Sequence, residues 1–172
     1  AIQIYKKVLV IDPENRLALF GLATLYHRAG QIEAARPVYG KLLAIDPDNR
    51  DALNNFLVLL SDESPQEALT QLGELQERNP AFSSIPAQMG IIYQKTGDLE
   101  KAGEMMSMAI ALAPENLIYR HNMAIILDKQ RKYDEAAPIY RLLLEAHLRG
   151  EAIPGNAQKI QERLTFLGSN KH

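Results

Sequence analysis

Few side chains in this sequence stand at spacings that would support catalysis or metal binding. The only histidines are His27, His121, His147 and His172. No two of them have the spacing of a metal-binding pair, such as His-Glu-x-x-His on a helix. A polar histidine on a helix surface is the ordinary case, so His27 and His121 are interpreted as surface residues rather than catalytic ones.

Other constellations that carry chemistry are also absent from the sequence. It contains no cysteine, which excludes disulfides, thiolate zinc sites and a cysteine nucleophile. No glycine-rich phosphate loop and no Gly-x-Ser-x-Gly motif occurs. The acid pairs Asp62/Glu63 and Asp134/Glu135 are expected at helix starts, where carboxylates complement the helix dipole. The sequence therefore predicts no enzyme activity, no metal and no cofactor.

The composition is that of a globular chain without a strong charge bias. Apolar residues make up 47% and charged residues 23% of the sequence, which excludes wholesale disorder. Nineteen Lys plus Arg against 21 Asp plus Glu give a net charge of −2. This balance supplies no basic surface for nucleic acid, and no apolar run approaches the roughly 18 residues of a membrane span. We therefore predict no nucleic-acid partner and no membrane insertion. Nothing in the composition indicates a cellular compartment.

An internal repeat of about 34 residues runs through most of the chain. Five alanines recur at intervals of 34, 33, 34 and 34 residues: Ala1, Ala35, Ala68, Ala102 and Ala136. Prolines follow the first four of these alanines by twelve residues, at positions 13, 47, 80 and 114. A period of this length predicts stacked supersecondary units, each unable to bury its apolar face alone.

Each period is predicted to hold two helices. Residues 16–29 carry apolar side chains at i, i+3, i+4 and i+7, the stripe of an amphipathic helix, and Gly30 is expected to end it with a left-handed backbone. Residues 32–45 form the second helix, closed by Asp-Pro. The alanine columns are interpreted as points where two helix backbones approach closely.

Three prolines fall inside predicted helices. Pro37 and Pro138 are expected within about the first turn, where the backbone N–H groups have no intrahelical partner anyway. Pro86 is expected in the same kind of place, after Ser83 and Ser84 as capping residues.

A large residue, mostly tyrosine, follows each of the five alanines by four positions: Tyr5, Tyr39, Leu72, Met106 and Tyr140. These small and aromatic columns, with the closing prolines, resemble the tetratricopeptide repeat (TPR) family. The resemblance implies an all-α, right-handed solenoid of helix-turn-helix repeats and a role as a protein–protein interaction scaffold or adaptor. The array spans residues 1–150, with a half repeat at 1–15 and repeats at 16–49, 50–82, 83–116 and 117–150. The last repeat departs from the pattern, because Leu148 stands where the closing proline would be.

The two ends of the sequence carry further expectations. The first helix has apolar residues that would suit a preceding helix: Ile2, Ile4, Val8 and Leu9. We therefore expect a fragment beginning in mid-repeat, with homo-oligomerisation through this helix as one possibility. Residues 151–172 are expected to form a linker and a C-terminal cap helix. Asn156 would cap that helix, whose apolar face is Ile160, Leu164 and Leu167.

The resemblance also implies a binding surface, since first helices of TPR proteins line a concave groove that holds extended peptides or short helices. Placed on that pattern, the groove residues are Phe20, Thr24, Asn54, Asn55, Val58, Gln88, Ile91, His121, Asn122 and Ile125. An amide side chain offers both a donor and an acceptor, so it can pair with any peptide backbone. Amides beside an apolar strip therefore predict a mostly uncharged peptide partner, although the same amides could instead bridge adjacent helices.

Other functions are compatible with a TPR array. Some members grip a C-terminal carboxylate with Lys, Arg and Asn, but only Asn55 matches that set here, so a carboxylate clamp is not expected. The chain could be a self-associating assembly module. It could also be a regulatory or substrate-docking array attached to an enzyme domain upstream. In every case the expected partner is another protein.

Overall fold

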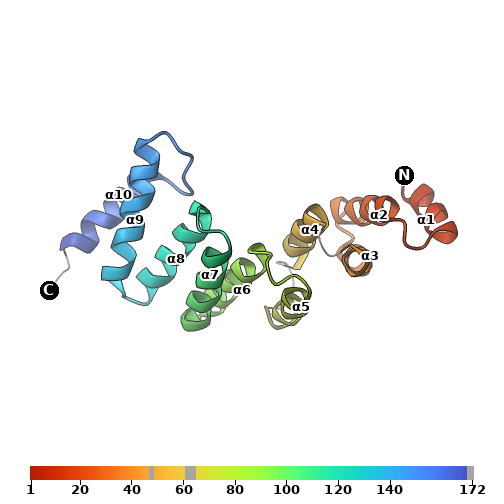
Figure 1. Ribbon diagram of the computed structural model, residues 1–172, viewed down its shortest axis with the longest axis horizontal. Coiled ribbons are helices and arrows are strands. Elements are labelled where there is room, and N and C mark those ends of the chain that lie inside the picture. The colour runs from red at the N-terminus through yellow and green to blue at the C-terminus, as the bar shows by residue number, and fades with distance from the viewer. Residues whose placement is uncertain (47–48, 61–64, 170–172) are drawn as a thin grey trace. The chain divides into compact units, whose positions relative to one another are not determined.

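The computed structural model describes residues 1–46, 49–60 and 65–169, and these residues form ten α-helices and no strand (Figure 1). The all-α class predicted from the repeat is confirmed. Pro47, the Asp62/Glu63 pair and His172 lie outside the described residues. The chain divides into two compact units, residues 1–80 and 81–172.

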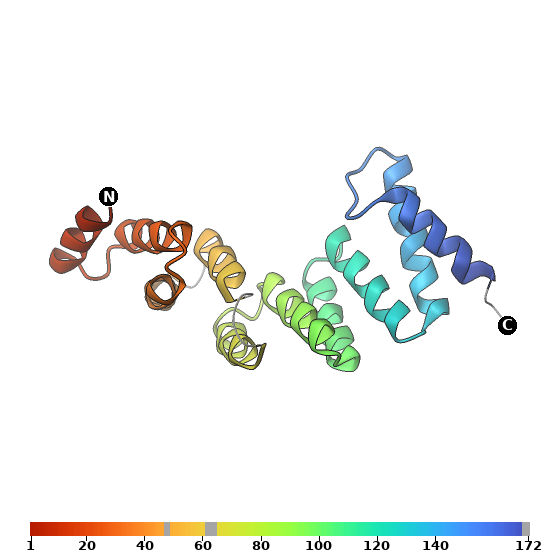
Figure 2. The same ribbon diagram turned by 180° about the vertical axis from the view of Figure 1, so that it is seen from behind.

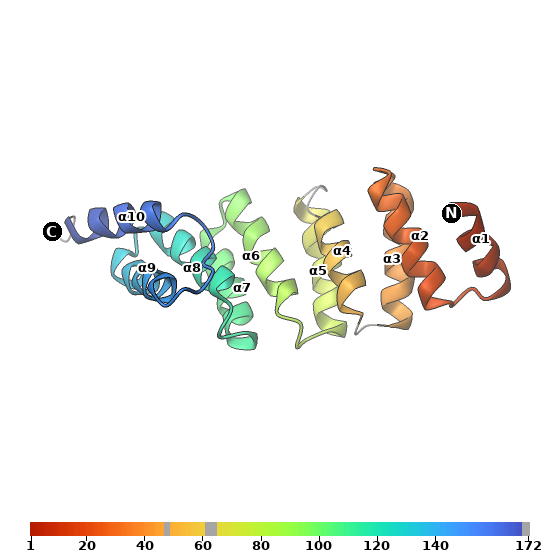
Figure 3. The ribbon, with the colours of Figure 1, turned by 90° about the horizontal axis from the view of Figure 1, so that it is seen from above.

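Unit 1 contains five helices: α1 (Ile2–Ile11), α2 (Arg16–Arg28), α3 (Ile32–Ile45), α4 (Arg50–Leu60) and α5 (Pro65–Arg78). Helix α2 packs against α1, α3 and α4, and α3 also packs against α4; Figure 3 shows α2 and α3 side by side. Helix α2 begins where Asn15 Oδ1 accepts a hydrogen bond of 2.9 Å from Ala18 N. It ends just before Gly30, whose φ of 69° is the left-handed conformation that the sequence predicted.

Unit 2 repeats this construction. Its helices are α6 (Ser84–Thr96), α7 (Leu99–Leu112), α8 (Leu117–Lys129), α9 (Tyr133–Leu148) and α10 (Ala157–Ser169). Helix α7 packs against α6 and α8, and α9 packs between α8 and the C-terminal α10 (Figure 2). Asp98 and Asn116 cap α7 and α8 through their side-chain oxygens. Asn156 Oδ1 accepts from Lys159 N at 3.2 Å, so the predicted cap of α10 is confirmed.

The alanine columns lie where helices meet, except at Ala1, which is exposed. Ala35 and Ala102 are 0% exposed, and Ala68 is 1% exposed. Gly90 on α6 shows how tight the approach is, since a Cβ there would lie 3.1 Å from the Ala102 carbonyl oxygen on α7. The larger side chains around these points are fully buried, Tyr39 and Met106 among them. Burying each such side chain stabilises the fold by about 1.5–3 kcal/mol.

Two expectations about helix starts are wrong. Pro37 and Pro138 lie inside α3 and α9, in the second turn and not the first. Each therefore removes one intrahelical hydrogen bond, and the packing of the helices holds them through that point. Ser83 occupies the N-cap position of α6, but its side chain makes no capping bond. Its hydroxyl instead lies 3.3 Å from the Tyr119 hydroxyl of α8.

The cap helix α10 is joined to the array by a polar cluster around Arg163. Arg163 donates from Nε to Asp128 Oδ2 at 2.6 Å and makes a second bond from its Nη2 to Asp128 Oδ1. The guanidinium lies 4.5 Å from the Phe166 ring centre. Tyr140 donates to the same Asp128 carboxylate at 3.4 Å. Burial first, and then this carboxylate, raise the pKa of Tyr140 to about 12.

Helix α1 is held more loosely than the others. None of its residues is buried, and Ile4, Val10 and Ile11 are 66%, 82% and 86% exposed. Its main anchor is Tyr5, whose ring occupies the space where a side chain at Gly21 would be. Of the four apolar residues singled out in the sequence, Ile4 is exposed, whereas Ile2, Val8 and Leu9 are half-buried.

Candidate functional site

In unit 1, the predicted groove residues lie on the neighbouring helices α2 and α4. Phe20 and Thr24 on α2 are half-buried. On α4, Asn55 is half-buried, Asn54 is exposed and Val58 is 59% exposed. We call these five residues the unit 1 face.

One residue of the unit 1 face, Thr24, also takes part in the packing of the helices. The Thr24 hydroxyl shares a hydrogen bond of 3.3 Å with the hydroxyl of Tyr39 on α3. Tyr39 itself is buried between the His27 and Phe56 rings, each 6.3 Å away between centres. Thr24 therefore supports the packing of α2 on α3 and offers less to a ligand than Val58 does.

In unit 2, the corresponding residues lie on α6 and α8, which also contact each other. Gln88 and Ile91 come from α6, and His121, Asn122 and Ile125 come from α8; all five are half-buried. We call them the unit 2 face. Ile91 packs against the buried cluster that contains Ala102 and Met106, so only part of it is available to a partner.

The asparagine amides of both faces are free of internal bonds. Among the described residues, no hydrogen bond joins the Asn54, Asn55 or Asn122 side chain to another group. The alternative that these three amides serve only to bridge helices is therefore not supported by the contacts in the structure.

Two exposed apolar residues next to these faces were missed by the sequence reasoning. Leu17 on α2 is 83% exposed and Ile118 on α8 is 57% exposed. They lie three residues before Phe20 and His121, so each shares a helix face with the predicted residue. The sequence held only part of this signal, because the same repeat position is Asp51 and Ser84 in the two repeats between them.

The linker before α10 contacts the unit 2 face at His121. A Cβ at Gly155 would lie 3.3 Å from both Cε1 and Nε2 of the imidazole. Gly155 has a φ of 83°, a left-handed backbone that favours glycine. Burial lowers the pKa of His121, because the charged imidazolium loses its hydration there.

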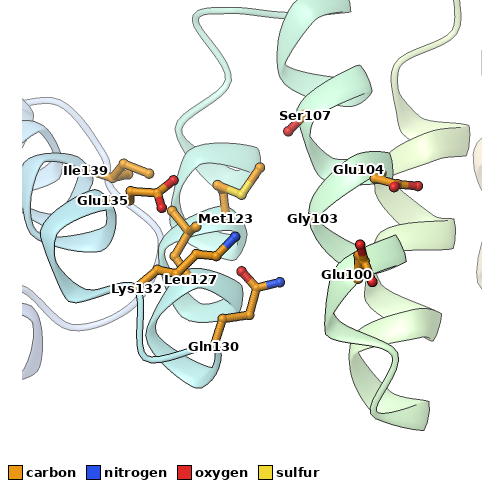
Figure 4. Close-up of a pocket in the computed structure, with 10 residues that line it drawn as sticks. All are labelled: Glu100, Gly103, Glu104, Ser107, Met123, Leu127, Gln130, Lys132, Glu135 and Ile139. Carbon is orange, nitrogen blue, oxygen red and sulfur yellow. The ribbon is translucent and has the colours of Figure 1, made fainter.

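A separate crevice of about 470 Å³ opens between α7, α8 and α9 (Figure 4). We call it the unit 2 crevice. It is lined by Glu100, Gly103, Glu104, Ser107, Met123, Leu127, Gln130, Lys132, Glu135 and Ile139. Gln130 Nε2 donates to the carbonyl oxygen of Leu99 at 2.7 Å, which joins the end of α8 to the start of α7 beside this opening.

Unit 1 has an equivalent crevice of about 300 Å³ between α3, α4 and α5, which we call the unit 1 crevice. Phe56 lines it at the repeat position that Met123 holds in unit 2. Arg36 and Arg78 line this crevice, at the repeat positions that Gly103 and Ala146 hold in unit 2. The same place in two repeats thus carries different charge.

Within the described part of the chain, no group of three or more His, Asp or Glu side chains is placed so that it could hold a metal ion. None of the described helices combines the length and the apolar character that a membrane crossing requires.

Comparison with known proteins identifies the repeat. Models of the tetratricopeptide repeat family match residues 1–56, 87–116 and 120–152. The chain belongs to the tetratricopeptide repeat family. A TPR repeat-containing protein of Methanocaldococcus jannaschii, MJ1428, is 28% identical over 158 residues, which are 84% of this chain and 27% of that protein. The chain thus spans about a quarter of the length of this relative.

Solved structures share the TPR fold. The pilF protein of Pseudomonas aeruginosa has a TM-score of 0.73 at 25% identity, over 97% of this chain and 75% of that one. A MamA structure has a TM-score of 0.71 at 23% identity, over 87% and 88% of the two chains. YrrB, described as a TPR protein with an unusual peptide-binding site, has a TM-score of 0.61 at 20% identity, over 81% and 73%.

Proposed function

We propose that this TPR chain is a protein–protein interaction scaffold that binds an extended or helical peptide segment on the faces of its first helices. The observation that carries the proposal is the pairing of free amides with exposed apolar side chains on α4. There Asn54 and Asn55 have no internal partner, and Val58 is 59% exposed beside them.

The chemistry of such a face suits a mostly uncharged peptide. An asparagine amide can donate to a backbone carbonyl and accept from a backbone N–H, whatever the peptide sequence. Val58 and the exposed Leu17 and Ile118 would cover apolar side chains of the partner. YrrB, described by its peptide-binding site, has the same fold, which supports a peptide as the kind of ligand.

A random peptide library displayed on phage, selected against the chain, would test this proposal. Peptides obtained in this way are then titrated against Asn55→Ala and Asn122→Ala by fluorescence polarisation. Each lost backbone-pairing amide should weaken binding by about 0.5–1.5 kcal/mol, or about two- to twelvefold. The control is Gln161→Ala, an exposed amide of α10, which should leave the affinity unchanged.

The proposal fails if selected peptides bind both asparagine variants as tightly as they bind the parent chain. The partner would then use another surface. Self-association is the second candidate function, and the specific observation that favours it is the exposed apolar face of α1.

A further inference from the structure

We propose that the linker between α9 and α10 occupies one end of the unit 2 face as an internal ligand, and that a partner peptide binds there by displacing it. The displacing peptide has the chemistry of the linker, which is an uncharged stretch with an aliphatic residue followed by proline and glycine. The proposal rests on the function proposed above, because it assigns a ligand chemistry and a competing segment to the same face.

The linker is longer than the turn that joins the preceding repeats. Helix α7 ends at Leu112 and α8 begins at Leu117, whereas α9 ends at Leu148 and α10 begins at Ala157. The additional residues pass beside the start of α8 before α10 begins (Figure 1). Residues 151–153 are neither helix nor turn, and the residue before a proline favours an extended backbone. A segment with the conformation of an extended peptide therefore already lies on α8.

Two contacts hold the linker against α8. The Ile153 side chain is half-buried and packs, together with Leu117, on the core cluster that contains Leu127. Further along, Gly155 lies against the imidazole of His121, since a Cβ there would be 3.3 Å from two of the ring atoms. His121 was assigned to the peptide groove from the repeat pattern alone. The linker thus lies where a peptide ligand was expected.

The middle of the linker is held by apolar contacts only. Within the described part of the chain, residues 152–155 form no hydrogen bond and no ion pair with the helices. Glu151 N donates to the carbonyl oxygen of Ala146 on α9 at 3.0 Å, and the Asn156 carbonyl oxygen accepts from Ile160 N of α10 at 3.0 Å. The middle segment can therefore leave α8 without breaking a hydrogen bond, while both of its ends stay fixed.

The linker leaves apolar surface uncovered beside it. A cleft of about 450 Å³ opens between the linker and the start of α8, where Ile118 is 57% exposed. The residues that line the cleft are Glu115, Asn116, Leu117, Ile118, Ala152, Ile153 and Pro154. A partner peptide that covers Ile118 as well as the position of Ile153 buries more apolar area than the linker does, and this gain favours displacement.

The test uses the full chain and a capped synthetic peptide with the sequence of residues 151–156, Glu-Ala-Ile-Pro-Gly-Asn. Ile153→Ser with Pro154→Ser removes the apolar side chains of the linker but keeps its length and the left-handed Gly155; we call it the released variant. In NMR titrations the peptide should bind the released variant and shift the backbone amide of Ile118 and the imidazole signals of His121. A control peptide with serine in place of its isoleucine and proline should not bind.

The parent chain should bind the same peptide about four- to twelvefold more weakly than the released variant. This is the range for withdrawing about half of an isoleucine side chain from its apolar contacts, which must happen before the peptide can bind. The matched control is Leu148→Ser. It removes an apolar side chain that is 85% exposed at the end of α9, next to the linker in sequence, and should bind the peptide as weakly as the parent does.

The imidazole of His121 reports independently whether the linker leaves α8. Burial lowers the pKa of His121 in the parent, so release should raise it toward the ordinary value of about 6.5. The Cε1–H signal followed against pH measures this change. An unchanged pKa in the released variant would mean that Ile153 does not hold the linker in place, and the proposal would be wrong.

The proposal is also overturned if the peptide at millimolar concentration, about the effective concentration of a short tethered segment, does not bind the released variant. Equal binding to the parent and the released variant overturns it as well. Phage-selected peptides separate this result from the proposed function. If they bind both proteins equally and shift Asn122 and Ile125, the face binds peptides and the linker does not compete for it.

Discussion

Replacing Gly90 by alanine tests whether the helices of a repeat approach as closely as the small-residue columns imply. A Cβ at this position would lie 3.1 Å from the Ala102 carbonyl oxygen and 3.4 Å from the Met106 nitrogen. Both are backbone atoms of α7, so they cannot move aside as a flexible side chain can. The added methyl must push α6 and α7 apart.

Two opposing effects set the magnitude. Overpacking a tight contact costs about 1–3 kcal/mol, whereas alanine in place of glycine favours a helix by about 1 kcal/mol. Gly90→Ala should therefore lower the free energy of unfolding by about 0–2 kcal/mol. Gly103→Ala isolates the packing effect, because its Cβ would lie 3.9 Å from Gln130 Nε2 and Ile126 Cγ2, which is ordinary contact.

Gly103→Ala should stabilise the chain by about 0.5–1 kcal/mol, which places the two variants about 1–3 kcal/mol apart. Urea unfolding followed by circular dichroism measures this difference, and hydrogen exchange of the α6 and α7 amides localises it. Repeat arrays can unfold locally, so the urea transition alone does not show whether the whole chain unfolds. Hydrogen exchange separates local opening of α6 and α7 from global unfolding. If both variants stabilise the chain equally, α6 and α7 leave room for a methyl group at position 90. The inferred close approach of the two helices would then be wrong.

Three further predictions concern helix α1, the anchor of α10 and the buried imidazole of His121. Ile4→Ser with Ile11→Ser should abolish any dimer seen in sedimentation of the parent, because these exposed side chains of α1 favour association; an unchanged dimer would place the contact elsewhere. Arg163→Ala should cost about 1–2 kcal/mol after allowance for solvent exposure, and hydrogen exchange should rise first in α10, the helix that its pair with Asp128 anchors. Burial lowers the folded-state pKa of His121 below its unfolded value, so the stabilisation is present above about pH 6.5 and is lost as the pH falls through the folded pKa. The melting temperature should therefore decline below that pH in the parent, and decline less in His121→Gln. If the melting temperatures of both proteins fall equally with pH, His121 is not the group responsible.

The repeat made the helices predictable, because period, alanine columns and closing prolines all agree. The second helix was expected at residues 32–45, and α3 spans Ile32–Ile45. The cap of α10 by Asn156 was equally clear from local sequence. In both cases the residues that set where the helix begins or ends lie within a few positions of that helix in the sequence.

What the sequence did not reveal depends on partners distant along the chain. The hydroxyls of Ser83 and Ser84 lie 3.3 Å from the Tyr119 hydroxyl, 36 and 35 residues away. The pair of Arg163 with Asp128 likewise joins residues 35 apart. Pro37 was misplaced because a helix held by its neighbours tolerates a lost hydrogen bond that an isolated one would not.

Helix α8 explains why the crevice was missed although the face was anticipated. Successive residues of a helix point about 100° apart, so α8 divides its side chains among three surroundings. Ala124 is buried in the core, Asn122 belongs to the unit 2 face, and Met123 lines the crevice. A search for one recurring stripe finds the core and the face opposite it. The crevice takes its chemistry from α7 and α9 as well, whose glutamates look like ordinary solvated charge when each helix is considered alone. Only the packing of three helices forms the crevice over its apolar floor of Met123, Leu127 and Ile139, and no single helix carries a pattern that announces it.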